Sequence, residues 1–105
     1  MRVARRFLLS GRVQGVGFRW FVQELAVREG AAGWVRNRPD GRVEALLQGE
    51  AEAVLRAERQ IRRGPPASTV ADVQAFDEPV SDRLRAFEIR TTLTTFAPSS
   101  LTDEE

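Results

Sequence analysis

Gly11-Arg12-Val13-Gln14-Gly15-Val16-Gly17-Phe18-Arg19 is the stretch that decides the fold, because it separates a strand-like run from a helix-like run. Glycine has no Cβ, so a loop rich in it can adopt positive φ and bring its backbone close to a ligand. Successive N–H groups of such a loop can point inward and form a concavity that binds anions. The stretch therefore predicts a strand, an anion-binding loop and a helix, in that order.

The predicted helix adds to the anion-binding character of the loop. Its first N–H groups have no intrahelical partner and lie at the positive end of the helix dipole. Arg19, at the start of the helix, carries a planar guanidinium that can bind two phosphate oxygens at once. The simpler alternative is a tight strand-to-helix turn whose glycines only serve geometry, and the loop by itself does not decide between the two.

Three residue types that often carry catalysis are absent from the 105 residues: the chain has no His, no Cys and no Lys. Without His and Cys, the Ser-His-Asp and Cys-His mechanisms are excluded, and so are zinc sites made of cysteines. Without Lys, Schiff-base chemistry and the Lys-bearing phosphate loop of nucleotide triphosphatases are excluded as well. The length fits one domain with one hydrophobic core.

Charge is unevenly distributed along the chain, although the formal net charge is only +1. Residues 1–48 contain nine Arg and four acidic residues, whereas residues 49–105 contain seven Arg and eleven acidic residues. The glycine-rich loop lies in the positive half, which would attract an anionic substrate. No targeting segment opens the chain and no apolar run reaches membrane-spanning length, so we expect a soluble, cytoplasmic protein with no membrane partner.

Hydrophobic periodicity predicts the elements around the loop. They are a strand over 3–10, a helix over 19–29 ended by Gly30, a short strand over 33–37, a strand over 42–48, a helix over 50–63, a strand over 69–76 and a last short strand at 87–89. Asp40-Gly41 is typical of the hairpin turn between the second and third strands.

Both helices carry patterns that predict which side faces the core. On the first helix we expect one apolar stripe to lie on a sheet: Phe18, Phe21, Val22, Leu25 and Ala26. Trp20 falls on the opposite side, where it either covers the loop or, as we expect, packs on a neighbouring strand. On the second helix we expect the pairs Glu52/Arg56 and Glu58/Arg62, each four residues apart, on the solvent side.

The order of elements predicts an α+β fold of the ferredoxin-like type, a βαββαβ sandwich with an antiparallel sheet and two helices on one face. The first two strands run in the same direction, because one helix returns the chain between them. Their ends and the start of the first helix then share one edge, which brings Asn37 near Arg19. We expect this domain to span residues 1–92 and the Thr/Ser-rich, acidic residues 93–105 to form a mobile tail.

Two motifs carry a resemblance to a known family. They are Gly11-x-Val13-Gln14-Gly15-Val16-x-Phe18-Arg19 and Gly33-Trp34-Val35-x-Asn37-x-x-x-Gly41-x-Val43, followed by Gly49 and by Gly64-Pro65. In order and spacing they resemble the acylphosphatase family. The likeness runs from about Arg5 to Thr91 and leaves out only the tail.

The resemblance implies a small ferredoxin-like enzyme, an acylphosphatase, that hydrolyses the carboxyl-phosphate bond of acyl phosphates without cofactor or metal. It implies two catalytic residues: Arg19 binds and neutralises the phosphate, and Asn37 orients the attacking water. It also implies that the phosphate is cradled by the backbone of a phosphate-binding loop formed by Val13, Gln14, Gly15, Val16, Gly17 and Phe18.

Physical reasoning agrees with these roles. Fixed N–H dipoles and a guanidinium can stabilise the charge on phosphate oxygens more in the transition state than in the ground state. A carboxylate is a good leaving group, so a chain without His lacks nothing that the reaction needs. The neutral amide of Asn37 can both donate to and accept from a water molecule.

Each of these residues also has a structural alternative. Arg19 could be a surface cation, although a helix N-terminus disfavours a cation that has no anion beside it. Asn37 could be a turn residue before Pro39. Gln14 is expected to shape the loop rather than contact the reacting atoms. Four further arginines are expected around the loop and are called the basic surround: Arg12, Arg36, Arg38 and Arg42. They either steer anionic substrates toward the site or are simply solvated surface residues.

Two rival functions remain open. The first is a ferredoxin-like module that binds nucleic acid or regulates without catalysis. Against RNA binding, the sequence lacks an aromatic-rich strand for stacking bases, since only Phe7 and Trp34 lie near the first two predicted strands. The second is a detached relative of the acylphosphatase-like domain found at the front of larger carbamoyl-transfer maturation proteins. The length of the chain and its lack of zinc-binding cysteines favour a free-standing enzyme instead. We therefore expect a monomer that acts on a small-molecule acyl phosphate and has no nucleic-acid partner.

Overall fold

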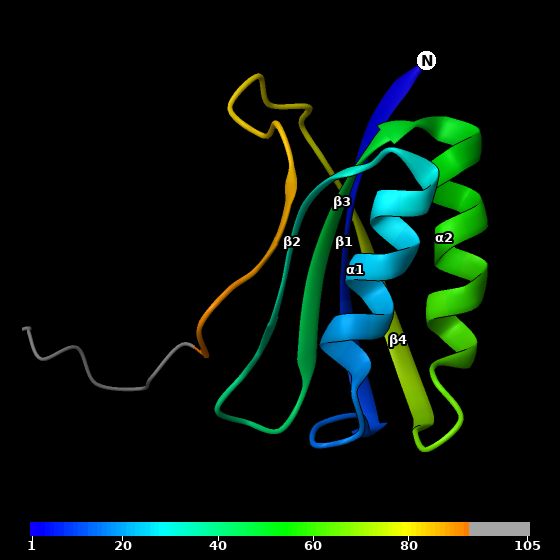
Figure 1. The fold of residues 1–105 in the computed structure, drawn as a ribbon, viewed down its shortest axis with the longest axis vertical. Coiled ribbons are helices and arrows are strands. Elements are labelled where there is room, and N and C mark those ends of the chain that lie inside the picture. Colours follow the sequence, from blue (N-terminus) through cyan, green and yellow to red (C-terminus); the bar gives the residue numbers. More distant parts are fainter. Residues whose placement is uncertain (93–105) are drawn as a thin grey trace, which may run out of the picture.

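The computed structural model describes residues 1–92, which form two helices on one face of a five-stranded sheet (Figure 1). The predicted tail, 93–105, lies outside the described residues. The elements in chain order are β1 (Arg2–Arg12), α1 (Phe18–Glu29), β2 (Ala32–Asn37), β3 (Val43–Glu50), α2 (Ala51–Arg63), β4 (Thr69–Glu78) and β5 (Phe87–Ile89). Type and order agree with the prediction, and the boundaries differ by one or two residues.

The strand order across the sheet is β4-β1-β3-β2-β5. β3 pairs antiparallel with both β1 and β2, so β1 and β2 run in the same direction, as predicted. The predicted last strand is β5, which pairs parallel with β2 and makes the sheet mixed. Its backbone is held at both ends, because Gly33 N–H donates to the Ala86 carbonyl (3.0 Å) and Arg90 N–H donates to the Val35 carbonyl (2.8 Å).

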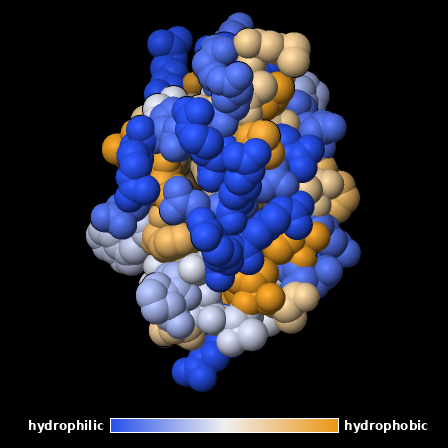
Figure 2. All heavy atoms as spheres, turned by 90° about the vertical axis from the view of Figure 1, so that its right-hand side faces the viewer, coloured by the Kyte–Doolittle hydropathy of each residue, from blue (hydrophilic) through white to orange (hydrophobic). Residues whose placement is uncertain are grey.

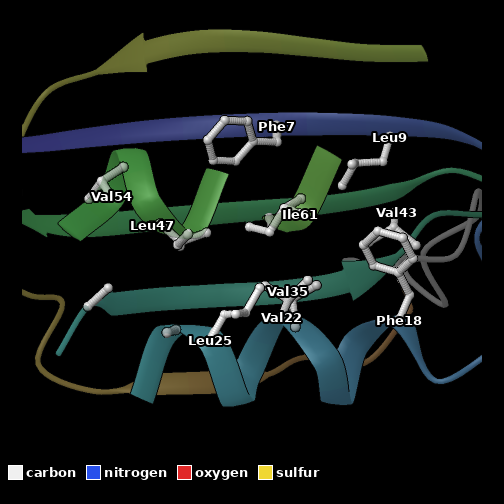
Figure 3. Packing of buried hydrophobic residues seen from close by; sticks show 14 of the residues in the cluster. Phe7, Leu9, Phe18, Val22, Leu25, Val35, Val43, Leu47, Val54 and Ile61 are labelled. Atoms are coloured by element: carbon white, nitrogen blue, oxygen red, sulfur yellow. The ribbon is translucent and has the colours of Figure 1, made fainter. Parts of the chain in front are cut away.

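The hydrophobic core fills the space between the sheet and the two helices (Figure 3). Alternate residues of each central strand face the helices, because successive side chains of a strand point to opposite faces. Helix residues three and four apart face the sheet in turn. The largest completely buried hydrophobic side chains are Phe7, Phe18, Leu9, Leu25, Leu47 and Ile61.

The expectation for Trp20 was wrong: its side chain is 70 % exposed. Phe18, Val22 and Leu25 take the sheet-facing stripe of α1 as predicted. Trp20 lies on the other side of the helix, which no strand or helix of residues 1–92 covers. Val27, which also points away from the sheet, is exposed as well.

The expectation for the acidic residues of α2 was wrong in two details. Glu58 is buried, with 7 % of its surface exposed, and it accepts hydrogen bonds from Arg5 of β1 as well as from Arg62. Arg56 donates to Glu29 of α1 (2.9 Å) and not to Glu52. Glu58 faces the sheet because the Arg5 guanidinium supplies a charged partner there, which makes burial of a carboxylate tolerable.

The outer side of α2 is polar. Viewed from that side, Figure 2 shows mostly hydrophilic residues, with the hydrophobic ones broken into separate areas. Leu55 is the exposed large hydrophobic residue of this helix. No helix within residues 1–92 combines the length and the apolar character needed to cross a membrane.

Gly11 lies at an irregularity near the end of β1, one residue before the strand ends at Arg12 and the loop begins. Its φ is +122°, and the register between β1 and β4 shifts between Ser10 and Gly11. A Cβ at this position would collide with the carbonyl oxygen of Thr69 in β4. Only glycine permits this close approach of two strands together with a positive φ.

Candidate active site

The loop between β1 and α1 is fixed at both ends and open in the middle. Val13 and Phe18 are buried in the core, whereas Gly15 and Gly17 are exposed. Gly15 and Gly17 have φ of +74° and +80°, in the left-handed region that other residues rarely adopt. The two hydrophobic anchors thus hold a short turn whose backbone faces solvent.

Within the described residues 1–92, the N–H groups of this loop have no hydrogen-bond partner. Among residues 1–92, no backbone N–H from Gln14 to Trp20 donates to a backbone or side-chain acceptor. Gly17 is the N-cap of α1 and supplies no side-chain cap, and the first turn of α1 contains no acidic residue. Unpaired donors at the positive end of a helix dipole form a ready anion-binding site.

Arg19 lies in this first turn and is half-buried. Within the described part of the chain it makes no ion pair and no side-chain hydrogen bond. A cation is unfavourable at this end of a helix unless an anion accompanies it. The guanidinium therefore adds to the positive potential at the loop rather than being cancelled by a neighbouring acid.

Asn37 is the last residue of β2 and lies at the predicted edge. It is paired in register with Val43, and Val43 is paired on its other side with Leu9 near the end of β1. The ends of β1 and β2 thus flank the start of β3. The carboxamide of Asn37 is half-buried and has no hydrogen-bond partner among residues 1–92, so its polar atoms are free for a ligand.

Gln14 connects the loop to the turn that follows Asn37. Its Nε2 donates to the carbonyl oxygens of Arg38 (2.8 Å) and Arg42 (2.9 Å). The expectation that Gln14 shapes the loop agrees with this position. The long-range partner could not be read from the sequence, because nothing in the spacing of Gln14 specifies two carbonyls more than twenty residues away.

The arginines of the expected basic surround are largely neutralised. Arg36 and Arg38 both pair with Glu44, which is only 4 % exposed, and Arg42 pairs with Asp40. Arg12 is exposed. Three of these four residues thus form ion pairs with the protein itself. Within residues 1–92, Arg12 and Arg19 form none, and of these two Arg19 is the half-buried one in the first turn of α1.

These ion pairs are reflected in the acidity of the two carboxyls. Burial pushes the pKa of Glu44 upward, but the hydrogen bonds and charges of Arg36 and Arg38 outweigh burial and hold that pKa below its ordinary value. Hydrogen bonds from the side chain and backbone of Arg42 lower the pKa of Asp40 to about 2. Both carboxyls are therefore ionised at neutral pH and hold the β2–β3 turn in place.

Within residues 1–92, no three His, Cys, Asp or Glu side chains are grouped so that they could hold a metal ion. Arg19 and the unpaired N–H groups at the start of α1 contribute positive charge at this edge. Fold and site together define a class of small α+β protein, a ferredoxin-like sandwich with an open anion-binding loop at one edge of its sheet.

Comparison with known proteins identifies the family. The family model for acylphosphatase matches residues 5–89. An acylphosphatase from Koribacter versatilis is 49% identical over 88 residues, which cover 84% of this chain and 80% of that protein. The crystal structure of acylphosphatase from Bacillus subtilis matches with a TM-score of 0.80 at 40% identity, covering 84% of this chain and 98% of that chain.

The chain therefore belongs to the acylphosphatase family. Acylphosphatase function, expected from the two sequence motifs, is confirmed by this membership, and the chain is an enzyme. The comparisons give no support to a nucleic-acid-binding or regulatory module. A further likeness is to full-length HypF in its phosphate- and nucleotide-bound form, with a TM-score of 0.81 and 26% identity, covering all of this chain and 12% of that one.

Proposed function

We propose that the backbone N–H groups of the loop from Val13 to Phe18 and the guanidinium of Arg19 bind the phosphate of an acyl phosphate. The observation that carries this proposal is the row of N–H groups at the start of α1 that have no partner among residues 1–92, with a guanidinium in the same turn that is likewise unpaired there. One phosphate can accept from these donors at once. Because the donors are already in place, they stabilise charge on the phosphate oxygens in the transition state without reorganising.

Asn37 orients the attacking water in this proposal. Its carboxamide offers two donors and an acceptor, none of which is used within residues 1–92. The water oxygen attacks phosphorus in line with the bond to the acyl oxygen, that bond breaks, and the carboxylate leaves with the bonding electrons. The products are a carboxylate and inorganic phosphate. The two protons of the water stay on the phosphate product or pass to solvent, and the leaving carboxylate needs no protein acid.

The proposed reaction uses no metal ion. The support is the donor set: the chain has no His or Cys, and residues 1–92 bring no three acidic side chains together. Arg19 and the α1 N-terminus supply the positive charge that a bound cation would otherwise supply.

The test is release of inorganic phosphate from acetyl phosphate at neutral pH, with and without an excess of chelator. We expect equal rates in both, and competitive inhibition by added inorganic phosphate. Activity that disappears in chelator would contradict the metal-free reaction. Inhibition by phosphate that is not competitive would remove the loop from the substrate site.

The monomeric state, the cytoplasmic location and the lack of a nucleic-acid partner belong to the same proposal. Gel filtration measures the first. For the last, salt-dependent RNA binding that survives Arg19→Ala would favour a nucleic-acid-binding role over the one proposed.

A further inference from the structure

The two halves of the proposed site stand on different segments of the chain. The loop and Arg19 follow β1, whereas Asn37 ends β2, and these strands are not neighbours in the sheet. Strand pairing joins them only through β3. Something more direct must fix their separation if a water held by Asn37 is to meet a phosphate held by the loop.

Gln14 makes the direct connection. Its side chain reaches from the loop to the carbonyls of Arg38 and Arg42 at 2.8 and 2.9 Å. These two carbonyls already accept backbone hydrogen bonds that close the β2–β3 turn, from Gly41 N–H (3.1 Å) and Arg38 N–H (2.8 Å). A carbonyl oxygen has two lone pairs, so each can accept from Gln14 in addition.

The chemistry of this contact explains why the residue is a glutamine. The amide nitrogen has two N–H donors, and each finds one carbonyl. Arg38 directly follows Asn37, so one of the two bonds ends on the residue next to the proposed water-orienting amide. The other side of the same turn is held by Glu44, which accepts from both Arg36 and Arg38.

We propose that Gln14 is a positioning residue that sets where Asn37 stands relative to a phosphate bound in the loop. It touches neither the water nor the phosphate through its side chain and acts through Asn37. The inference rests on the role proposed above for Asn37. An error of about 1 Å in the placement of a reacting group can cost about 10²-fold in rate, so a contact of this kind has kinetic consequences.

The test is Gln14→Met, which keeps the length of the side chain and removes both donors. We expect kcat for acetyl phosphate to fall about 10-fold, while KM and the inhibition constant of inorganic phosphate stay within about 3-fold of wild type, because the loop N–H groups remain. Gln14→Leu serves the same purpose should the methionine variant not fold.

Gln48 offers a matched control. It is a buried glutamine on β3 whose side chain also bonds the backbone of a distant segment, donating to the carbonyl of Ser81 (2.9 Å) and accepting from its N–H (2.8 Å). This contact lies at the end of β3 away from the site, opposite Ala4 and Ala32. We expect Gln48→Met to lower the melting temperature and leave kcat within 2-fold.

A double-mutant cycle separates positioning from general loosening of the loop. In an Asn37→Ala background, Gln14→Met should lower kcat less than 2-fold further, because the residue through which Gln14 acts is gone. A full 10-fold loss in that background overturns the proposal, and so does a Gln14→Met variant that changes phosphate affinity alone. Wild-type turnover of Asn37→Ala by itself would instead refute the role of Asn37, and with it this inference.

Discussion

The two helices of the sandwich begin in opposite ways. The first turn of α1 has a glycine N-cap, no acidic residue and the cation Arg19. The first turn of α2 follows Glu50 and contains Glu52, and its first N–H, of Ala51, donates to the carbonyl of Met1 (2.8 Å). The helices run in opposite directions, so these two N-termini lie at opposite ends of the molecule (Figure 1).

This difference between the two helix N-termini shows which of them is left available to bind an anion. Both helices present a positive dipole end, and at α2 the chain itself supplies the compensating negative charge and an acceptor. At α1 the donors stay unpaired within residues 1–92, and a cation is added. The acid and the acceptor at the start of α2 stabilise the fold. The start of α1 lacks that stabilisation, and an anionic ligand can supply the missing negative charge and acceptors.

The largest effect should come from removing the cation that distinguishes α1. We expect Arg19→Ala to lower kcat/KM for acetyl phosphate by about 10³-fold, because a charge-assisted, bidentate contact to the phosphate is lost in the transition state. Steady-state phosphate release measures it. Arg19→Lys is the control, since it keeps the charge and loses the planar fork; recovery to wild-type rates by Lys would show that charge alone is enough.

Removing Asn37 should leave the open helix N-terminus intact and still stop the chemistry. We expect Asn37→Ala to lower kcat about 10²-fold with little change in the affinity for inorganic phosphate, because the water loses its orienting group and the anion site does not. Kinetics together with a phosphate titration separate the two quantities. Weakened phosphate binding of the same size would place Asn37 in the anion site instead.

Giving α1 an acid in its first turn should make it resemble α2. Trp20 is exposed, so Trp20→Glu removes little packing from the core. At the third helical position a Glu can reach back to the N-cap N–H of Gly17 and interacts favourably with the dipole. We expect the inhibition constant of inorganic phosphate to rise about 2–5-fold, which corresponds to the ~0.3–1 kcal/mol of such a charge.

Trp20→Leu is the control for that variant, because it removes the ring without adding charge. A rise of equal size in both variants would assign the effect to the indole. The melting temperature of Trp20→Glu should not fall, since the new acid stabilises the helix.

The smallest effect should come from the converse change at α2. We expect Glu52→Gln to destabilise the fold by about 0.5 kcal/mol, through lost interaction with the dipole, and to leave kinetics unchanged. Urea denaturation at low salt measures this difference, and added salt should shrink it because the residue is exposed. A change in kcat would mean that the two ends of the molecule are coupled.

Local patterns in the sequence predicted the elements that carry this comparison. Glycines at 15 and 17 predicted a loop with positive φ, and the order of elements predicted that Asn37 and the loop share an edge, since parallel strands on both sides of β3 must end together. Trp20 and Glu58 were placed wrongly for one common reason. Helical periodicity shows which residues lie on the same side of a helix. It does not show whether another part of the chain covers that side, or which charged residue of the sheet lies opposite it.

The sequence by itself determined the family, the fold and the position of the two proposed catalytic residues, because these depend on spacing, on residue type and on the order of elements. The tertiary structure decided which charges remain available. Arg36, Arg38 and Arg42 look like Arg19 in the sequence, yet folding brings Glu44 and Asp40 to them and no acid to Arg19 among residues 1–92. It also decided that Gln14 meets the turn after Asn37, since such contacts join residues distant in the chain and depend on the packed arrangement of the strands.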